Sequence, residues 1–431
     1  MKNKQSLFRK IGSLILVSGM LVGMLAGCGK KEEQTKKEES VVEIPIVLTV
    51  NPSTGKKNEQ TLVNAFNKEY EETYKLEVEW KMETEEDYRQ NLKRRNVTDT
   101  LPAIVTDLRM LPSFYQMMIA DNRLEELSSY IQEDKEWKEM IEPFVLESCS
   151  EPNGNMYLAP LSTAAFSCSG VFWNEELFAQ AGIAEFPKTW NSFWECCEQL
   201  QAAGITPIGL HTEGTAWAPM LLATAELADT EEGLAFMKKL YPASYQNKEG
   251  IHLAQTLQRL FQYTTEDALY ADFDVAYNNF FSGKVAMIPN GYWMIDQIPK
   301  EWEGRTRFSS FPGNKLITSP ETFGWAVISN YNEEVKEGAL EFLKFRTKMN
   351  LIEKKQAFQE DRSRMMKAKQ DYLAAYEQEP QFVPNYQVKW NSILQEETLG
   401  EELPKLVKDK ITLEEFTFQA DESIRRFMAE Q

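Results

Sequence analysis

Few residues in this sequence are candidates for catalysis or for metal binding. Two histidines and five cysteines leave little for a zinc site built from imidazole or thiolate ligands. No G-x-S-x-G, H-E-x-x-H, P-loop or G-x-G-x-x-G motif is present, so no nucleophile, zinc or nucleotide site is indicated. The 66 acidic residues leave room for a pair of catalytic carboxylates, but no motif isolates one. We therefore expect no catalysis, no cofactor and no bound metal.

Polar side chains stand at the ends of two predicted strands. The run 41–50 is apolar and β-branched, and Asn51 and turn residues follow it. The run 103–106 is another such strand, with Asp107 at its end. A strand over 76–80 and two amphipathic helices lie between them, so the order β-α-β-α-β predicts a parallel sheet with helices on both faces. Ligands of such sheets bind beyond the carboxyl ends of the strands, where Asn51 and Asp107 lie.

The second half of the chain has its own helices and strands. Residues 190–203 predict an amphipathic helix, with Thr189 as its N-cap and Gly204 as its stop. The C-terminal quarter is mostly helical in pattern, and no internal repeat is visible. The other predicted elements are strands over 285–288 and 322–329 and a helix over 335–345.

Composition excludes several classes of protein. A chain of 431 residues with 42% hydrophobic and 12% aromatic residues can build two or three folded domains, so wholesale disorder is excluded. The net charge of −19 repels phosphates, and we expect no nucleic-acid partner. Beyond the N-terminus there is no further long apolar run, which excludes a protein with several membrane spans.

The N-terminus resembles the export signal of a bacterial lipoprotein. A basic start precedes an apolar run over 11–25, which is shorter than the roughly 20 residues of a membrane span but suits a signal peptide. The run ends in Leu25-Ala26-Gly27-Cys28, similar to a lipobox, in which the cysteine becomes the first mature residue and carries acyl chains such as palmitate. We expect a signal peptide over 1–27, lipidation of Cys28 and a flexible tether over 28–42.

Besides Cys28, which we expect to be lipidated, the mature chain has four cysteines, namely Cys149, Cys168, Cys196 and Cys197. Export permits disulfides, and four cysteines allow three pairings between which the sequence does not choose. Cys196 and Cys197 are neighbours on a predicted helix and point about 100° apart, so a bond between them is disfavoured. We favour reduced cysteines in the core.

Segments in the middle of the chain resemble one protein family. Residues 153–160 (NGNMYLAP) look like a segment of the bacterial extracellular solute-binding proteins of family 1, and residues 281–293 (FSGKVAMIPNGYW) look like a later block of that family. These proteins serve carbohydrate ABC importers, and maltose-binding protein is a distant member. The resemblance covers roughly residues 43–425. Further matches follow in the family's order at 171–174, 187–190, 203–208, 323–329, 339–343 and 383–390.

Three positions depart from the family's pattern. Ala103 stands where an aspartate is often found, Trp173 where a tyrosine is common, and Tyr292 where maltose-binding relatives have proline. These departures concern the sugar rather than the fold.

The resemblance implies an α/β fold of the periplasmic-binding-protein-like type II, with two α/β lobes, a hinge and an interlobe cleft. We expect one lobe over 43–155 plus 320–365 and the other over 156–319 plus 366–431. The implied function is capture of a carbohydrate, above all an oligosaccharide, in the cleft and its delivery to the permease subunits of an ABC importer. The implied location is the extracellular face of the cell membrane, as a lipid-anchored monomer.

A sugar site needs flat rings for the apolar faces of the sugar and polar side chains for its hydroxyls. The resemblance places stacking residues at Trp293 and Trp390. Trp325 suits the core of a strand as well as a sugar site. The full set of expected ligand-binding residues is Asn51, Asp107, Glu213, Trp217, Asn290, Trp293, Trp325 and Trp390.

Two other functions remain open at this point. An exported glycoside hydrolase would use two carboxylates and would release a reducing sugar. A surface adhesin or non-catalytic structural lipoprotein would favour repeats or a β-rich domain, and neither is seen in the sequence. Stabilisation by an unchanged saccharide would distinguish a binding protein from both.

Overall fold

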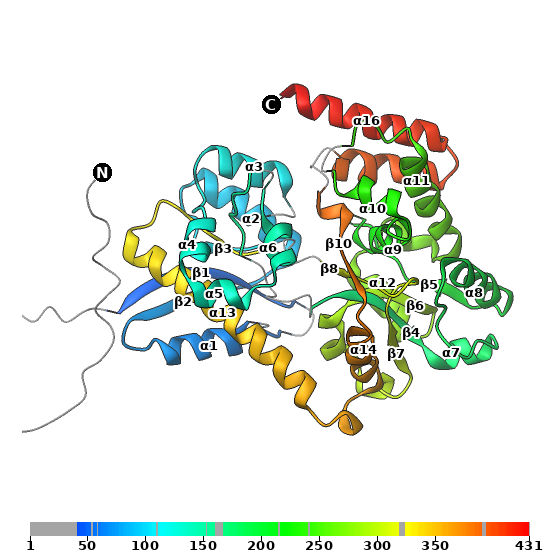
Figure 1. Cartoon of the computed structure of the whole chain (residues 1–431), viewed down its shortest axis with the longest axis horizontal. Helices are drawn as coiled ribbons and strands as arrows, with labels where there is room; N and C mark the ends of the chain where they lie inside the picture. Colours follow the sequence, from blue (N-terminus) through cyan, green and yellow to red (C-terminus); the bar gives the residue numbers. More distant parts are fainter. Residues whose placement is uncertain are drawn as a thin grey trace, which may run out of the picture. The chain divides into compact units, whose positions relative to one another are not determined.

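The computed structural model describes most of the chain after residue 40. The described ranges are 41–52, 55–57, 59–108, 111–151, 153–159, 167–213, 216–239, 242–318, 324–389 and 394–430. The predicted signal peptide, Cys28, most of the predicted tether and Trp390 lie outside these ranges. The described residues form two β-sheets with helices packed against them (Figure 1).

The first sheet is mostly parallel. β1 pairs in parallel with β2 and β3, and β9 is antiparallel to β3, which gives the order β2-β1-β3-β9. The predicted β-α-β-α-β order is confirmed, since one helix follows each of the first two strands. The elements are β1 (Val42–Val50), α1 (Gln60–Glu69), β2 (Tyr74–Met82), α2 (Glu85–Val97), β3 (Ile104–Val105), α3 (Pro112–Ala120), α4 (Ser128–Glu133), α5 (Lys135–Met140), α6 (Pro143–Cys149) and β9 (Ala326–Val327).

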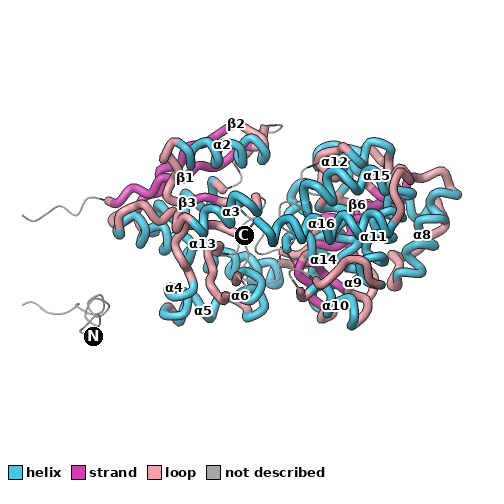
Figure 2. The backbone as a smooth tube through the Cα atoms, turned by 90° about the horizontal axis from the view of Figure 1, so that it is seen from above, coloured by secondary structure: helices cyan, strands magenta, loops and turns pink. Residues whose placement is uncertain are grey.

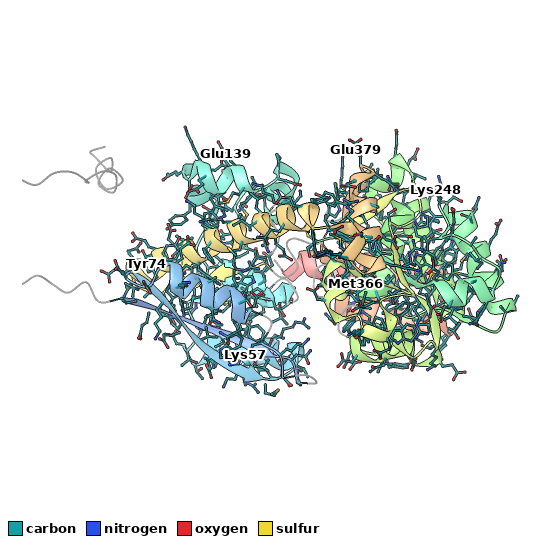
Figure 3. The ribbon with its side chains drawn as sticks, turned by 90° about the horizontal axis from the view of Figure 1, so that it is seen from below. Lys57, Tyr74, Glu139, Lys248, Met366 and Glu379 are labelled. Carbon is teal, nitrogen blue, oxygen red and sulfur yellow. The ribbon has the colours of Figure 1, made fainter. Side chains whose placement is uncertain are left out.

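Apolar spacing in the sequence explains this arrangement. Val63 and Phe66 lie on one face of α1, and both are buried against the sheet. Phe66 contacts Phe342 and Phe345 edge to face, at ring-centroid distances of 5.2 and 5.5 Å. Figure 3 shows the side chains of the first sheet, with Tyr74 labelled at the start of β2.

The second sheet is mixed. β4 is antiparallel to β6, β7 and β8, while β5 pairs in parallel with β6 and β10 in parallel with β8. The order along the sheet is therefore β10-β8-β4-β6-β5, with β7 also pairing to β4. The strands are β4 (Ser169–Asn174), β5 (Thr206–Ile208), β6 (Val285–Gly291), β7 (Thr306–Ser309), β8 (Lys315–Thr318) and β10 (Gln381–Pro384).

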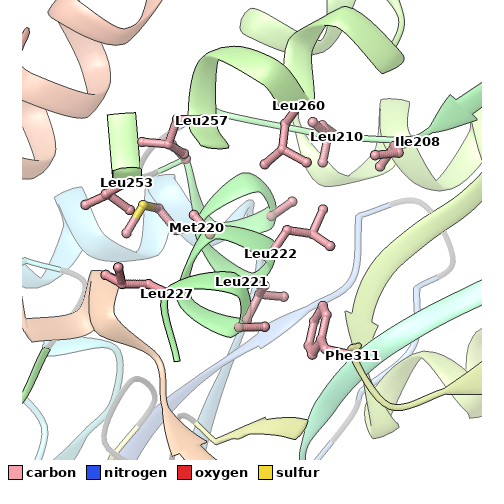
Figure 4. Packing of buried hydrophobic residues seen from close by; sticks show 14 of the residues in the cluster. Ile208, Leu210, Met220, Leu221, Leu222, Leu227, Leu253, Leu257, Leu260 and Phe311 are labelled. Atoms are coloured by element: carbon pink, nitrogen blue, oxygen red, sulfur yellow. The ribbon is translucent and has the colours of Figure 1, made fainter. Parts of the chain in front are cut away.

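Helices cover the second sheet. One of them, α9 (Trp217–Leu227), is buried on all sides from Ala218 to Ala225, as expected of a helix that is apolar around its whole circumference. Figure 4 shows Leu221 of this helix beside Phe311, with Leu253, Leu257 and Leu260 of α11 (Lys248–Leu260) on the other side of the helix. The remaining helices are α7 (Glu175–Gln180), α8 (Trp190–Ala202), α10 (Glu231–Met237), α12 (Phe273–Phe281), α14 (Lys367–Glu377), α15 (Leu403–Val407), α16 (Leu413–Glu430) and a π-helix over Leu394–Glu402.

The predicted start of α8 is confirmed in detail. The Thr189 hydroxyl accepts from the Ser192 N–H at 3.2 Å, and the Ser192 hydroxyl accepts from the Thr189 N–H at 3.1 Å. This reciprocal cap satisfies two backbone donors at the helix start. Gly204 has a positive φ of 76° two residues after the helix, which explains why a glycine stops the pattern there.

The helix predicted over 335–345 is much longer in the structure. It is α13 (Glu333–Gln359), which passes beside β1 (Figure 2). Its residues Val335 to Phe345 pack in the core of the first sheet, whereas Ala357 packs in a core of the second. The prediction stopped too early because the sequence after Phe345 is rich in charge and loses its apolar period.

The structure buries all four cysteine thiols, those of Cys149, Cys168, Cys196 and Cys197. Burial raises the pKa of Cys196 to about 12 and raises the pKa of Cys168 well above its usual range. The predicted reduced core cysteines are confirmed. None of the described helices has the length and apolar character needed to cross a membrane.

Candidate functional site

Four strands of the second sheet end at one edge. β5, β6, β8 and β10 run in the same direction, so their carboxyl ends meet there together with the start of β4. Small molecules bind to α/β sheets at such an edge. We call it the second-sheet edge and define it by His211, Trp217, Asn290, Trp293, Asn385 and Gln387.

Trp293 presents its ring on this edge. It lies in a short 3-10 helix after β6 and is 37% exposed, which is unusual for so large an apolar side chain. The ring lies across Gly291, where an added Cβ would overlap it. A glycine at the end of β6 is therefore what allows the indole to rest against the backbone.

Trp217 is the second ring of the edge. Its ring centre lies 5.8 Å from that of Trp293, and the two planes are inclined by 47°. Trp217 is the first residue of α9 and follows Ala216, whose φ of 52° is in the left-handed region. The Nε1 donor of Trp217 is buried and has no hydrogen-bond partner. The two tryptophans thus form an open pair of rings with one unused donor.

His211 lies behind this pair. Its ring centre is 6.1 Å from Trp217 and 5.9 Å from Phe273, and the residue is 8% exposed. Burial lowers the pKa of His211 from its usual 6.5 to about 4, against the opposing charge of Asp272. The imidazole is therefore neutral at pH 7, and its Nε2 has no partner. The sequence analysis did not select His211, because no residue near it in the sequence indicates that it lies beside these rings.

Asn290 also lies on the second-sheet edge, within β6. It is fully buried, and its Oδ1 accepts from the Gly291 N–H at 2.8 Å. That bond leaves the Nδ2 donor without a partner. An unpaired buried donor costs free energy, so Asn290 is a plausible contact for an oxygen atom of a solute.

The first sheet ends in carboxylates. We call this region the first-sheet edge and define it by Asn51, Glu83 and Asp107, which follow β1, β2 and β3. Asn51 is exposed, and its N–H donates to the Lys56 carbonyl at 3.0 Å. Asp107 is buried, with φ at 62°, and its Oδ2 lies 3.6 Å from Nη2 of Arg89. Aspartate and asparagine tolerate this conformation better than other non-glycine residues.

Sequence reasoning missed Glu83. It comes directly after β2, as Asn51 comes directly after β1, and its Oε1 is buried without a partner. The position of Glu83 after a strand was the available signal. It was missed because the sequence pattern ended this strand at Trp80, whereas the structure ends it at Met82. Figure 3 labels Lys57 near this end of the sheet, where its Nζ lies 4.8 Å from the Trp80 ring centre.

Two predicted residues, Trp325 and Glu213, are not among the residues that define the two edges. Trp325 is 2% exposed and packs in the core of the first sheet, 5.4 Å from Phe342 and 4.3 Å from the Arg346 guanidinium. This placement matches the core role that Trp325 also suited, and we leave Trp325 out of the proposed site. Glu213 is exposed, and its N–H donates to the Ala271 carbonyl at 3.0 Å. Among the described residues, no group of three histidine, cysteine or acidic side chains is placed to hold a metal.

Comparisons with known proteins identify the family of this chain. A profile of the family described as bacterial extracellular solute-binding protein matches residues 61–364. The chain belongs to this family. The resemblance drawn from the sequence is thereby confirmed, and a search of curated proteins gives no match.

Solved structures of this family share the fold at low sequence identity. A chitin oligosaccharide binding protein is 18% identical, with a TM-score of 0.66, over 89% of this chain and 99% of the other. A Streptococcus pneumoniae solute-binding protein in complex with the blood group A-trisaccharide is 17% identical, with a TM-score of 0.67, over 89% and 100%. A solute-binding protein in complex with raffinose is 18% identical, with a TM-score of 0.60, over 88% and 97%. These matches confirm the predicted type II periplasmic-binding-protein-like fold.

Proposed function

We propose that this solute-binding protein captures a carbohydrate outside the cell and delivers it unchanged to an ABC importer. The observation that carries the proposal is the pair Trp217 and Trp293, two rings 5.8 Å apart at the carboxyl edge of a sheet, one of them 37% exposed. Aromatic faces pack against the C–H faces of a sugar ring at little entropic cost, because their side chains are stiff.

Polar groups around the two rings suit the hydroxyls of a sugar. Asn290 Nδ2 and Trp217 Nε1 are buried donors without partners. On the first sheet, Glu83 and Asp107 are acceptors, and Arg89 lies 3.6 Å from Asp107. Hydroxyls both donate and accept, so the unpaired donors near the two rings and the carboxylates of the first sheet suit the two roles of the same group.

We propose that the two sheets belong to two lobes that close on the solute. The lobes would be 43–155 plus 320–365 and 156–319 plus 366–431, with the solute held between the two edges. Contacts to both edges form together only in the closed state, so the solute shifts the population towards closure. The permease subunits of the importer would then recognise the closed form.

The location follows from the N-terminal sequence. Cleavage before Cys28 and lipidation of this cysteine would fix a monomer to the outer face of the cell membrane. The segment from Lys30 to Ser40 is charged and lacks large apolar residues, so it would serve as a solvated tether. Globomycin-sensitive processing, detected as a mass shift of the mature chain, tests this part of the proposal.

The experiment that tests the central proposal is a thermal-shift screen of mono- and trisaccharides on the chain from residue 29 onward. A saccharide that binds should raise the melting temperature and should be recovered intact. Trp293→Ala should weaken its binding about tenfold or more in calorimetry. Phe418→Ala is the matched control, because Phe418 is also exposed but lies on α16.

Two outcomes would contradict the proposal. Release of a reducing sugar would indicate a glycoside hydrolase. The absence of any stabilisation by saccharides would indicate a different solute or a structural lipoprotein.

A further inference from the structure

We propose that Asn385 and Gln387 form a second recognition point on the second-sheet edge, which binds a hydroxyl group of the solute at a distance from the two tryptophans. The inference rests on the proposed function and deepens it. It assigns a site to two residues that the sequence analysis did not select.

Asn385 is fixed by the sheet. It is the first residue after β10, and its N–H donates to the Thr318 carbonyl at 2.8 Å, which extends the pairing of β10 with β8. Its side-chain Oδ1 accepts from the Gln387 N–H at 3.1 Å. The orientation of the amide is thereby set, and Nδ2 is left as a fully buried donor without a partner.

Gln387 supplies the complementary atom. Its Nε2 donates to Oε1 of Gln395 at 3.0 Å, which leaves Oε1 as an acceptor. This oxygen has no partner, and the residue is 1% exposed. Asn385 and Gln387 are two residues apart in the chain. Together they offer one uncharged donor, Nδ2 of Asn385, and one uncharged acceptor, Oε1 of Gln387.

A buried donor next to a buried acceptor suits a hydroxyl group of the solute. A hydroxyl accepts one hydrogen bond and donates another, whereas a carboxylate only accepts and an ammonium only donates. Burying both atoms unpaired costs free energy, and a hydroxyl that pairs with both recovers it. Charged ligands would be desolvated at this point without an opposite charge on either amide.

The surrounding helix supports a functional role. Gln395 is the second residue of the π-helix over Leu394–Glu402. π-helical turns are rare and occur frequently at functional sites. The irregular helix therefore holds Gln395 where it orients the side chain of Gln387.

The recognition point is distant from the tryptophans. β10 and β6 are separated by three steps in the order β10-β8-β4-β6, which is roughly 14 Å at the usual strand spacing. A single sugar ring does not span that distance. A solute that contacts both Trp293 and Asn385 must therefore contain several rings.

The test compares trisaccharides with monosaccharides. The probes are raffinose, maltotriose, chitotriose and xylotriose, with galactose, glucose, N-acetylglucosamine and xylose, each titrated by calorimetry into the chain from residue 29 onward. Asn385→Asp keeps the acceptor for the Gln387 N–H and removes the donor, and Gln387→Met keeps the length of the side chain. Each variant should bind the preferred trisaccharide about tenfold more weakly and any bound monosaccharide within about twofold of wild type.

The control is Thr398→Val. Thr398 is equally buried, lies on the same π-helix and has a hydroxyl 3.5 Å from that of Ser423, so its loss perturbs the region without touching the amide pair. This variant should leave trisaccharide binding unchanged. A crystal structure of the complex should show a saccharide oxygen within hydrogen-bonding distance of Asn385 Nδ2.

Five results would overturn the inference, and they are distinguishable. If wild type binds none of the probes, the proposed function fails and the inference fails with it. If Trp293→Ala weakens binding and both amide variants do not, only the inference fails. Equal losses for mono- and trisaccharides, or a loss in Thr398→Val, indicate a structural role. A water molecule in place of the saccharide oxygen likewise contradicts it.

Discussion

The two sheets end in different chemistry. The first-sheet edge carries the carboxylates of Glu83 and Asp107 beside the Arg89 guanidinium. The second-sheet edge carries rings and amides, with the exposed ring of Trp293 beside the partly buried ring of Trp217. Both edges are the carboxyl ends of strands, so the same topology supports both.

The difference follows from what stands after each strand. β1, β2 and β3 are followed by polar residues, and Asn51, Glu83 and Thr106 are the first residues after these strands. β6 ends in Gly291, which leaves room for an indole to lie on the backbone. A charged edge binds solute oxygens strongly and by direction, whereas an aromatic edge binds the apolar faces of many sugars. We infer that the first-sheet edge supplies polar contacts to the oxygen atoms of the solute, and that the second-sheet edge supplies apolar contact area to its rings.

The largest effect is expected from a tryptophan that belongs to neither edge. Trp325→Ala should lower the free energy of unfolding by about 3–5 kcal/mol, because it leaves a cavity in the first core. Trp293→Ala, in contrast, should cost about 1 kcal/mol or less. Urea unfolding of both variants measures this. Equal losses would erase the distinction between a core tryptophan and an edge tryptophan.

The buried histidine should make the second sheet sensitive to acid. Because the folded chain lowers the pKa of His211 to about 4, the unfolded chain takes up the proton first as the pH falls below about 6.5. Stability should therefore be lost between about pH 6.5 and pH 4, by roughly 3 kcal/mol from this group.

Unfolding free energies of wild type and His211→Asn at pH 7 and pH 4 test this. The variant should lose less stability than wild type over this interval. An identical loss in both proteins would show that His211 does not resist protonation in the fold.

Gly291 positions Trp293 and allows a sharper test of the aromatic edge. Gly291→Ala should weaken saccharide binding about tenfold, equivalent to about 1.4 kcal/mol, because the new methyl group displaces the ring. Gly304→Ala is the matched control, since an added Cβ at Gly304 meets no atom within 4 Å. Calorimetry with the saccharide found by screening gives both values. Retained affinity in Gly291→Ala would mean that the ring orientation is not needed.

The smallest effect is expected at the first-sheet edge. Glu83→Gln keeps the shape of the side chain and removes its charge, and it should weaken binding about threefold to fivefold through a weaker acceptor. Glu43→Gln, on β1 near the opposite end of the same sheet, should leave affinity unchanged. Equal affinities in all three proteins would remove Glu83 from the site.

The regular parts of the fold were predictable from local pattern. The β-branched run that forms β1 and the Thr189 cap of α8 carry strong signals, and the structure confirms both. α13 shows the limit of such signals, because its second half is held by a different core and lacks an apolar period of its own.

The candidate site was only partly predictable. Trp217, Asn290 and Trp293 could be selected because they border polar or turn-rich sequence. Gln387 could not, since a glutamine three residues after a proline carries no local sign of burial. Its role depends on Gln395, which the π-helix brings to it. Such pairs arise from tertiary packing, which short sequence patterns do not encode.

The burial of all four cysteines of the mature domain makes the protein suitable for optical sensing. Thiols react with maleimides as thiolates. Burial limits access to all four cysteines and raises the pKa of Cys168, Cys196 and Cys197, which suppresses their ionisation. In a chain that begins after Cys28, Met82→Cys would add one accessible thiol, since Met82 is 64% exposed and precedes Glu83. A fluorophore attached there would report solute capture directly, without a disulfide to protect or a native thiol to remove.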